Sequence, residues 1–155
     1  GTVERSVLSP GVRVDPGAVV RDSIVMFDVV IRAGAVVDRA IIDKNVSIGP
    51  NAVIGMGTDF DTANRQEPTR LTSGITVVGK RATIPAGVRI GRNVKINEGV
   101  RPSDFGGRRM VPSGGTVEIH ESRAKKSSAR PAAPRKVEGE PMSERMTAAP
   151  REGGR

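Results

Sequence analysis

Aliphatic residues recur every six positions through much of the first hundred residues. Ten hexapeptides begin with Leu, Ile or Val, at positions 8, 14, 25, 31, 42, 48, 78, 84, 90 and 96. All ten carry Val or Ala at the fifth position, and nine carry Gly, Asn or Asp at the fourth, where Arg81 is the exception. Up to residue 54 the repeating unit is 17 residues long, whereas the interval of six is unbroken from Val78 onward.

Each position of the hexapeptide has a physical role. Gly, Asn and Asp tolerate a positive φ, so the fourth position marks a tight corner. The small fifth residue points inward after that corner, and the large aliphatic residue fills the interior of the next short strand. Three strands and three corners make a coil of about eighteen residues, and such coils stack at ~4.8 Å through parallel pairing. The pattern predicts an all-β fold, a left-handed parallel β-helix of hexapeptide repeats.

The spacing also divides the chain into segments. We expect β-helix coils of 17 residues over 1–54, a long inserted loop over 55–74 and coils of 18 residues over 75–100. Residues 101–120 are expected to form a C-terminal cap, and 121–155 a disordered basic tail. Gly1 is not Met and Val3 already occupies a repeat position, so the first coil lacks a cap of its own. We therefore expect a preceding domain to cover that end.

The composition excludes several kinds of functional site. The chain of 155 residues has no Cys and one His, which excludes disulfides, thiolate metal sites and a multi-histidine metal site. No apolar run approaches the ~20 residues of a membrane span and no signal segment opens the chain, so we expect a soluble, cytoplasmic protein. The net charge is +8, but acids interleave with the bases of the tail and no aromatic residue lies there, which makes nucleic acid an unlikely partner.

Catalytic signals are weak in this sequence. Acyltransferases built on hexapeptide helices use a histidine as general base, and the γ-type carbonic anhydrases use several as zinc ligands. Here the one histidine, His120, lies about twenty residues beyond the last hexapeptide. Aspartates at corners and on outward positions fit solvated faces, although a metal cluster among them stays open. We assign no catalytic and no metal-binding residue.

Basic residues near the corners are the remaining candidates. Arg39 and Lys44 flank the short strand AII, and Lys80 with Arg81 follows the long loop. Lys44 and Lys80 occupy comparable parts of successive hexapeptides, so the fold brings them close across the loop. Such cations either are solvated or bind an anionic metabolite through charge-assisted hydrogen bonds, and the pattern leaves both interpretations open.

Two motifs carry a more specific resemblance. The stretch DRAIIDK, followed by GITVVGK and IPAG, closely resembles the C-terminal β-helix domain of glucose-1-phosphate adenylyltransferase (ADP-glucose pyrophosphorylase), over roughly residues 1–118. In that family the whole enzyme joins ATP and glucose 1-phosphate to give ADP-glucose and pyrophosphate for glycogen synthesis. The resemblance places catalysis, with ATP and Mg²⁺, in an N-terminal domain whose motifs are absent from this chain, so no cofactor is expected here.

The resemblance also implies a role for the β-helix. In the family it packs on the N-terminal catalytic domain, builds a homotetramer and helps to bind sugar-phosphate or nucleotide effectors. Lys44 in IIDK and Lys80 in GITVVGK match basic effector contacts of the family, and Arg39 in DRAIIDK is a third candidate. Two alternatives remain: the β-helix of another sugar-nucleotide transferase, of the mannose-1-phosphate guanylyltransferase type, and a free-standing hexapeptide acyltransferase whose reaction would depend on His120.

Overall fold

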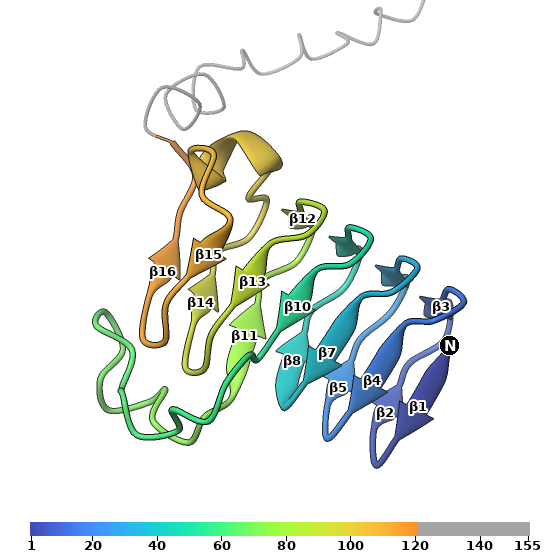
Figure 1. Cartoon of the computed structure of the whole chain (residues 1–155), viewed down its shortest axis with the longest axis horizontal. Helices are drawn as coiled ribbons and strands as arrows, with labels where there is room; N and C mark the ends of the chain where they lie inside the picture. Colours follow the sequence, from blue (N-terminus) through green and yellow to red (C-terminus); the bar gives the residue numbers. More distant parts are fainter. Residues whose placement is uncertain (121–155) are drawn as a thin grey trace, which may run out of the picture.

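The computed structural model describes residues 1–120, which form a parallel β-helix shaped as a triangular prism with three sheets as its long faces (Figure 1). Face A holds β1 (Thr2–Glu4), β4 (Val19–Arg21), β7 (Val36–Asp38), β10 (Val53–Ile54), β13 (Arg89–Ile90) and β15 (Met110–Val111). Face B holds β2 (Val7–Leu8), β5 (Ile24–Val25), β8 (Ala40–Ile42), β11 (Thr76–Val78), β14 (Lys95–Ile96) and β16 (Thr116–Val117). Face C holds β3 (Arg13–Val14), β6 (Val30–Ile31), β9 (Ser47–Ile48) and β12 (Thr83–Ile84).

Every strand pairs in parallel with a strand of an adjacent coil, which confirms the predicted β-helix. The register follows the repeat: Val25 lies opposite Ile42 of the next coil. Ile42 in turn lies opposite Val78, so the chain between β10 and β11 is inserted without shifting the pairing. A shift of one residue would turn the aliphatic side chains outward, because successive residues of a strand point to opposite faces.

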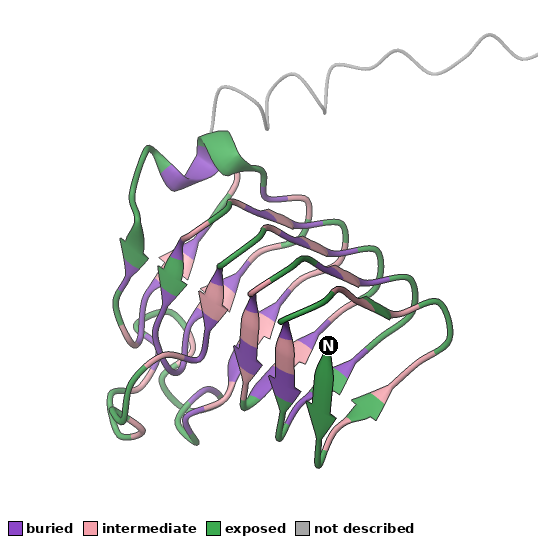
Figure 2. Ribbon diagram, turned by 45° about the vertical axis from the view of Figure 1, so that its right-hand side comes forward, coloured by how far each residue is buried: buried purple, intermediate pink, exposed green. Residues whose placement is uncertain are grey.

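The interior is filled by the first and fifth residues of the hexapeptides. From Ala18 onward these positions are at most 2% exposed, as the purple interior of Figure 2 shows. In the first coil Leu8, Val12 and Val14 are only partly buried, since one coil alone covers them. Phe105 is the single aromatic ring in the interior of the described residues. Each buried Val, Leu or Ile contributes roughly 1.5–3 kcal/mol by leaving water, so a column of aliphatic residues suffices as a core.

The corners adopt the backbone conformation that the sequence predicts. All ten residues at the fourth hexapeptide position have a positive φ. This includes Arg81, with φ +58°, although it is the one residue of the ten that is not Gly, Asn or Asp. Arg5, Asp22 and Arg39 turn the corner between faces A and B in the same way. A left-handed conformation costs an ordinary residue roughly 1–2 kcal/mol, which the parallel pairing on both sides of each corner must offset.

The chain leaves the prism after β10 and returns at β11 as a strap along the corner between faces A and B. Asn64, in the middle of the strap, is fully buried. Its Nδ2 donates to the carbonyl oxygens of Asn93, at 3.0 Å, and Gly115, at 2.8 Å. Its Oδ1 accepts the backbone N–H groups of Gln66, at 2.9 Å, and Glu67, at 3.0 Å. One side chain therefore ties the strap to two later coils.

The short 3₁₀ helix η1 (Pro102–Phe105) lies between β14 and β15, at the start of the last coil. Phe105 is buried against the core, and the Asp104 carboxylate accepts the backbone N–H groups of Arg101, at 2.7 Å, and His120, at 3.0 Å. The predicted disordered tail lies outside the described residues. Within residues 1–120 we find no helix of the length and apolarity that a membrane crossing requires.

Candidate functional site

Lys44 and Lys80 lie on adjacent coils, at the corner between faces B and C. Each is the second residue after its strand, since Ile42 of β8 pairs with Val78 of β11. The backbone N–H of Arg81 donates to the carbonyl oxygen of Lys44 at 3.0 Å, which brings the two corners into contact. The structure thus confirms that the inserted strap leaves the two lysines on adjacent coils. We call this edge the lysine corner and define it by residues 44, 80, 81 and 98.

One carboxylate faces the cations of the lysine corner. Glu98 lies on the next coil, where its Oε2 is 3.2 Å from Lys80 Nζ and its Oε1 is 3.6 Å from the guanidinium of Arg81. Within the described residues no carboxylate pairs with the ammonium group of Lys44, although its backbone N–H donates to Asp43 Oδ1 at 2.7 Å. The corner therefore carries three cations against one carboxylate; Lys80 is partly buried, and the other three residues are exposed to solvent.

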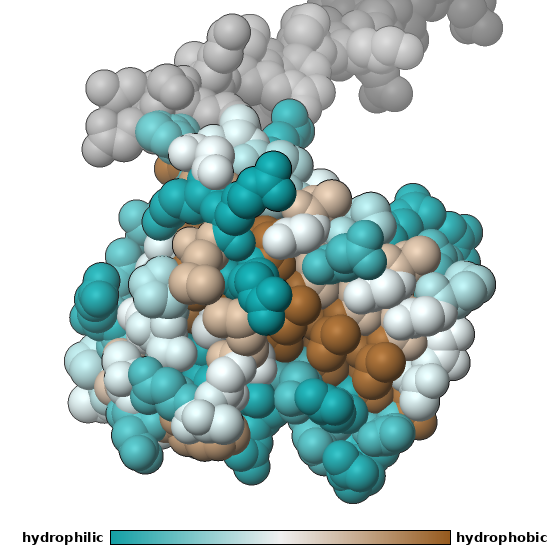
Figure 3. Space-filling view, viewed as in Figure 1, coloured by the Kyte–Doolittle hydropathy of each residue, from teal (hydrophilic) through white to brown (hydrophobic). Residues whose placement is uncertain are grey.

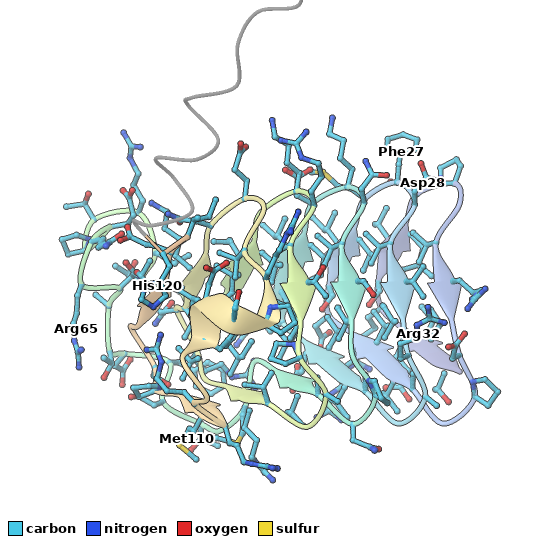
Figure 4. All side chains as sticks on the ribbon, turned by 90° about the horizontal axis from the view of Figure 1, so that it is seen from above. Phe27, Asp28, Arg32, Arg65, Met110 and His120 are labelled. Atoms are coloured by element: carbon cyan, nitrogen blue, oxygen red, sulfur yellow. The ribbon has the colours of Figure 1, made fainter. Side chains whose placement is uncertain are left out.

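Phe27 continues the same edge on the coil before Lys44. The backbone N–H of Asn45 donates to the Phe27 carbonyl oxygen at 3.0 Å, and the Phe27 side chain is 53% exposed. Figure 4 shows Phe27 and Asp28 together on this long edge of the prism. The exposed ring of Phe27 thus lies on the same edge as the lysine corner, one coil before Lys44.

Arg39 lies at a different corner from the two lysines. It turns the edge between faces A and B, and the strand β8 separates it from Lys44. Its guanidinium carbon is 5.1 Å from the centre of the Phe60 ring on the strap. The structure therefore brings Lys44 and Lys80 together but places the third predicted effector residue elsewhere.

Around Arg39 the structure shows a charge ladder that the sequence analysis missed. Arg5 donates to both carboxylate oxygens of Asp22, at 2.7 and 3.0 Å, and this hydrogen bond holds the pKa of Asp22 below its ordinary value. Arg21 donates to Asp38 at 3.0 Å. These residues border a hollow of about 470 Å³. The signal was present in the repeat, since charges of alternating sign stand 17 residues apart at this corner.

Arg92 has no comparable sequence signal. Its side chain is 6% exposed. It donates to the Asp38 carboxylate at 3.1 Å, to the Asp38 carbonyl oxygen at 3.2 Å and to the Gly57 carbonyl oxygen at 2.9 Å. It also lies 4.9 Å from the centre of the Phe60 ring. Because its partners come from a distant coil and from the strap, Arg92 fastens the start of the strap to the prism.

His120 shows no catalytic arrangement. Its ring is exposed at the far end of the prism from Phe27 (Figure 4), and within residues 1–120 its one hydrogen bond is from its backbone N–H to Asp104. Among residues 1–120 no three His, Cys, Asp or Glu side chains gather closely enough to hold a metal ion.

Comparison with known proteins gives a consistent picture. The family model described as "GlmU-like, C-terminal hexapeptide" matches residues 1–78. Glucose-1-phosphate adenylyltransferase of Thermomicrobium roseum is 63% identical over 97 residues, which are 63% of this chain and 22% of that protein. The enzyme of the same name from Acetivibrio thermocellus is 42% identical over 105 residues, 68% of this chain and 24% of that protein. The resemblance to this enzyme family is thereby confirmed, and the chain spans about a quarter of the length of these relatives.

A solved structure also aligns with the fold. The acetyltransferase domain of PglB from Neisseria gonorrhoeae matches with a TM-score of 0.38 and 19% identity, over 74% of this chain and 46% of that one. The hexapeptide pattern, its confirmation as stacked parallel coils and the family match over half of the sequence agree with one another. The chain belongs to the GlmU-like C-terminal hexapeptide family.

Proposed function

We propose that this chain is the regulatory and oligomerisation domain of a glucose-1-phosphate adenylyltransferase. The parent enzyme would join ATP and glucose 1-phosphate to give ADP-glucose and pyrophosphate in the cytoplasm, for glycogen synthesis. The support is the identity of 63% to such an enzyme over 97 residues. ATP and Mg²⁺ would be used by a catalytic domain outside this chain, and the chain alone would be inactive.

The observation that carries the regulatory role is the lysine corner. Coils of a β-helix are ~4.8 Å apart, so Lys44 and Lys80 present two ammonium groups at one edge. Two like charges on adjacent coils of one edge repel each other, and a shared phosphate group would relieve the repulsion through charge-assisted hydrogen bonds. Lys44 has no carboxylate partner within the described residues, so it is available to an anionic metabolite.

Exposed apolar ladders support a role in assembly. On face B, Val7 and Ile24 pair in register with their side chains 62% and 45% exposed, and the ladder continues through Ile41 and Val77. On face A a band crosses β4, β7 and β10, seen as the brown stripe in Figure 3. Contiguous apolar surface of this kind is typical of interaction sites. We propose that the catalytic domain and partner subunits of a homotetramer cover these faces.

The test of the effector role uses the full-length enzyme. Lys44→Ala and Lys80→Ala are each expected to raise the activating concentration of a sugar phosphate about tenfold or more, because a hydrogen bond to a charged group is worth about 1.5–3 kcal/mol. Basal turnover should stay within twofold. Arg13→Ala is the matched control, since it removes an exposed cation of the first coil that is not an effector candidate. An unchanged activation curve in both lysine variants would remove the assignment.

The second test concerns the catalytic domain. Sequencing the coding region upstream of Gly1 should reveal an in-frame nucleotide-binding domain with a glycine-rich phosphate loop. A start codon immediately before Gly1 would instead require a separate catalytic partner, and the proposal would stand only if one were found.

A further inference from the structure

A hollow of about 180 Å³ lies at the corner between faces C and A, near the C-terminal end of the prism. Within residues 1–120 face C has four strands, whereas faces A and B have six. After β14 the chain forms η1 where a fifth strand of face C would stand. Because a 3₁₀ turn does not continue the parallel ladder, Pro85 and Ala86 of the preceding coil stay partly uncovered. The hollow is a consequence of this change in structure.

The lining of the hollow is apolar except for two arginines. The apolar part comes from Pro85, Val88, Pro102 and Phe105, and the charged part comes from Arg108 and Arg109. The Nε of Arg108 donates to the carbonyl oxygen of Phe105 at 2.9 Å, which holds this side chain beside the hollow. The guanidinium groups and the apolar surface together suit a ligand that has carboxylates next to an apolar side chain.

Two further arginines extend the positive charge. The backbone N–H of Arg89 donates to the carbonyl oxygen of Arg109 at 2.9 Å, so these residues lie on adjacent coils, and Arg101 directly precedes η1. All four arginines are exposed, and none of them forms an ion pair with a carboxylate of residues 1–120. Such a group of like charges attracts a partner of opposite charge. We call it the arginine corner and define it by residues 89, 101, 108 and 109.

The turn at Gly106 and Gly107 adds a backbone donor to the arginine corner. Both residues have a positive φ, of +58° and +75°. A Cβ on either glycine would meet no atom within 4 Å, so the backbone is accessible here. The N–H of Gly107 makes no hydrogen bond within residues 1–120. Backbone N–H groups in turns of this kind can bind an anion.

One segment of this chain has the complementary composition. Residues 138–144, EGEPMSE, contain three glutamates, one methionine and no basic residue. The rest of 121–155 is different, since the whole stretch holds nine Lys and Arg against five Glu. Met142 lies two residues from Glu140 and two from Glu144. A methionine side chain is flexible and fills irregular apolar spaces, which suits the lining of the hollow.

The position of His120 brings this segment within reach. The backbone N–H of His120 donates to Asp104 of η1 at 3.0 Å, so residue 121 begins beside η1. Residues 121–137 can span at most about 56–61 Å when fully extended. The four residues of η1 span only about 8 Å. The connection is therefore long enough, and a tether of this kind gives an effective concentration of about 1 mM.

We infer that residues 138–144 dock on the arginine corner of the same molecule, with Met142 in the hollow and the glutamates paired with Arg108 and Arg109. A nucleic acid is the alternative anionic partner. The apolar lining favours the acidic segment, because a phosphate backbone has no apolar side chain to place there. The arginine corner lies on the opposite side of the prism from Phe27, as the position of Met110 in Figure 4 shows. The inference is thus independent of the lysine corner and goes beyond the proposed function.

The experiment uses the full 155-residue chain labelled with ¹⁵N and carrying a nitroxide on a cysteine introduced by Thr147→Cys. The chain has no other Cys, and position 147 lies outside the docking segment. Docking should selectively broaden the amide NMR signals of residues 86–89 and 105–110. A segment with a Kd of about 1 mM would be docked in about half of the molecules at the effective concentration given above. Raising the salt from 0.1 to 1 M should remove most of the broadening, since the Debye length falls from about 10 Å to about 3 Å.

Variants assign the broadening to the proposed contacts. Arg108→Glu combined with Arg109→Glu should abolish it, and Met142→Ser should reduce it. Arg65→Glu combined with Arg70→Glu is the matched control, because it reverses two exposed arginines of the strap and should leave the broadening unchanged. Unchanged positions of the remaining amide signals would show that each variant is folded.

Several outcomes would overturn the inference. They are equal broadening over the whole surface, broadening that survives reversal of Arg108 and Arg109, and broadening that persists between labelled and unlabelled chains in a mixture, which would come from a second copy. If single-stranded RNA shifts the signals of the arginine corner while the nitroxide leaves them sharp, the corner binds nucleic acid and the inference is wrong. The proposed function is tested separately, by Lys44→Ala and Lys80→Ala on another edge.

Discussion

Asn64 is the side chain on which the strap between β10 and β11 depends most. It is fully buried, and it donates two hydrogen bonds to carbonyl oxygens of later coils and accepts two from backbone N–H groups of the strap. Asn64→Ala leaves four backbone groups without these partners. A net value of roughly 0.5–1.5 kcal/mol for each hydrogen bond gives a loss of about 2–6 kcal/mol in the free energy of unfolding. That is a large share of the ~5–15 kcal/mol of a typical domain.

The assay is urea unfolding followed by far-UV circular dichroism, because the chain has no Trp and no Tyr to serve as a fluorescence probe. Gln66→Ala is the control on the same strap: the Gln66 side chain makes one exposed hydrogen bond, to Glu118, and its loss should cost under about 0.5 kcal/mol. Asn64→Asp keeps both accepted bonds but sets a carboxylate against two carbonyl oxygens, so it should be destabilising as well. A loss below about 1 kcal/mol for Asn64→Ala would refute the view that this residue anchors the strap.

Two further predictions concern charges at the corners. Glu98→Gln should tighten binding of inorganic phosphate about 2- to 5-fold, because it removes a carboxylate that competes with phosphate for Lys80 in an exposed ion pair worth ~0.2–1 kcal/mol. Glu118→Gln is the control. Weaker phosphate binding by Glu98→Gln would contradict this competition. The pKa of Asp22 is lowered by its hydrogen bond with Arg5, so the stability from that pair is present above the ordinary aspartate pKa of ~3.9 and is lost as the pH falls through the lower, folded-state value. Acid unfolding of Asp22→Asn should therefore lack this component, and a pH profile identical to that of the original chain would argue against it.

Much of the fold was predictable from the sequence because a β-helix repeats one local environment. Every sixth residue meets the same interior, so the aliphatic pattern predicts the inward positions and the register between coils. The meeting of Lys44 with Lys80 follows from that register, although 36 residues of chain separate them. Even Arg81 obeys the corner geometry, since the neighbouring strands impose a positive φ on whichever residue stands there.

What the repeat does not describe was decided by the tertiary structure alone. The strap has no period, so nothing in its sequence indicates that Asn64 lies against Asn93 and Gly115 or that Gly57 accepts a hydrogen bond from Arg92. Contacts between coils can be predicted from residue spacing, because each coil has the same shape as the coil before it. The contacts of an aperiodic segment instead depend on where the folded prism offers space and polar groups that need hydrogen-bond partners.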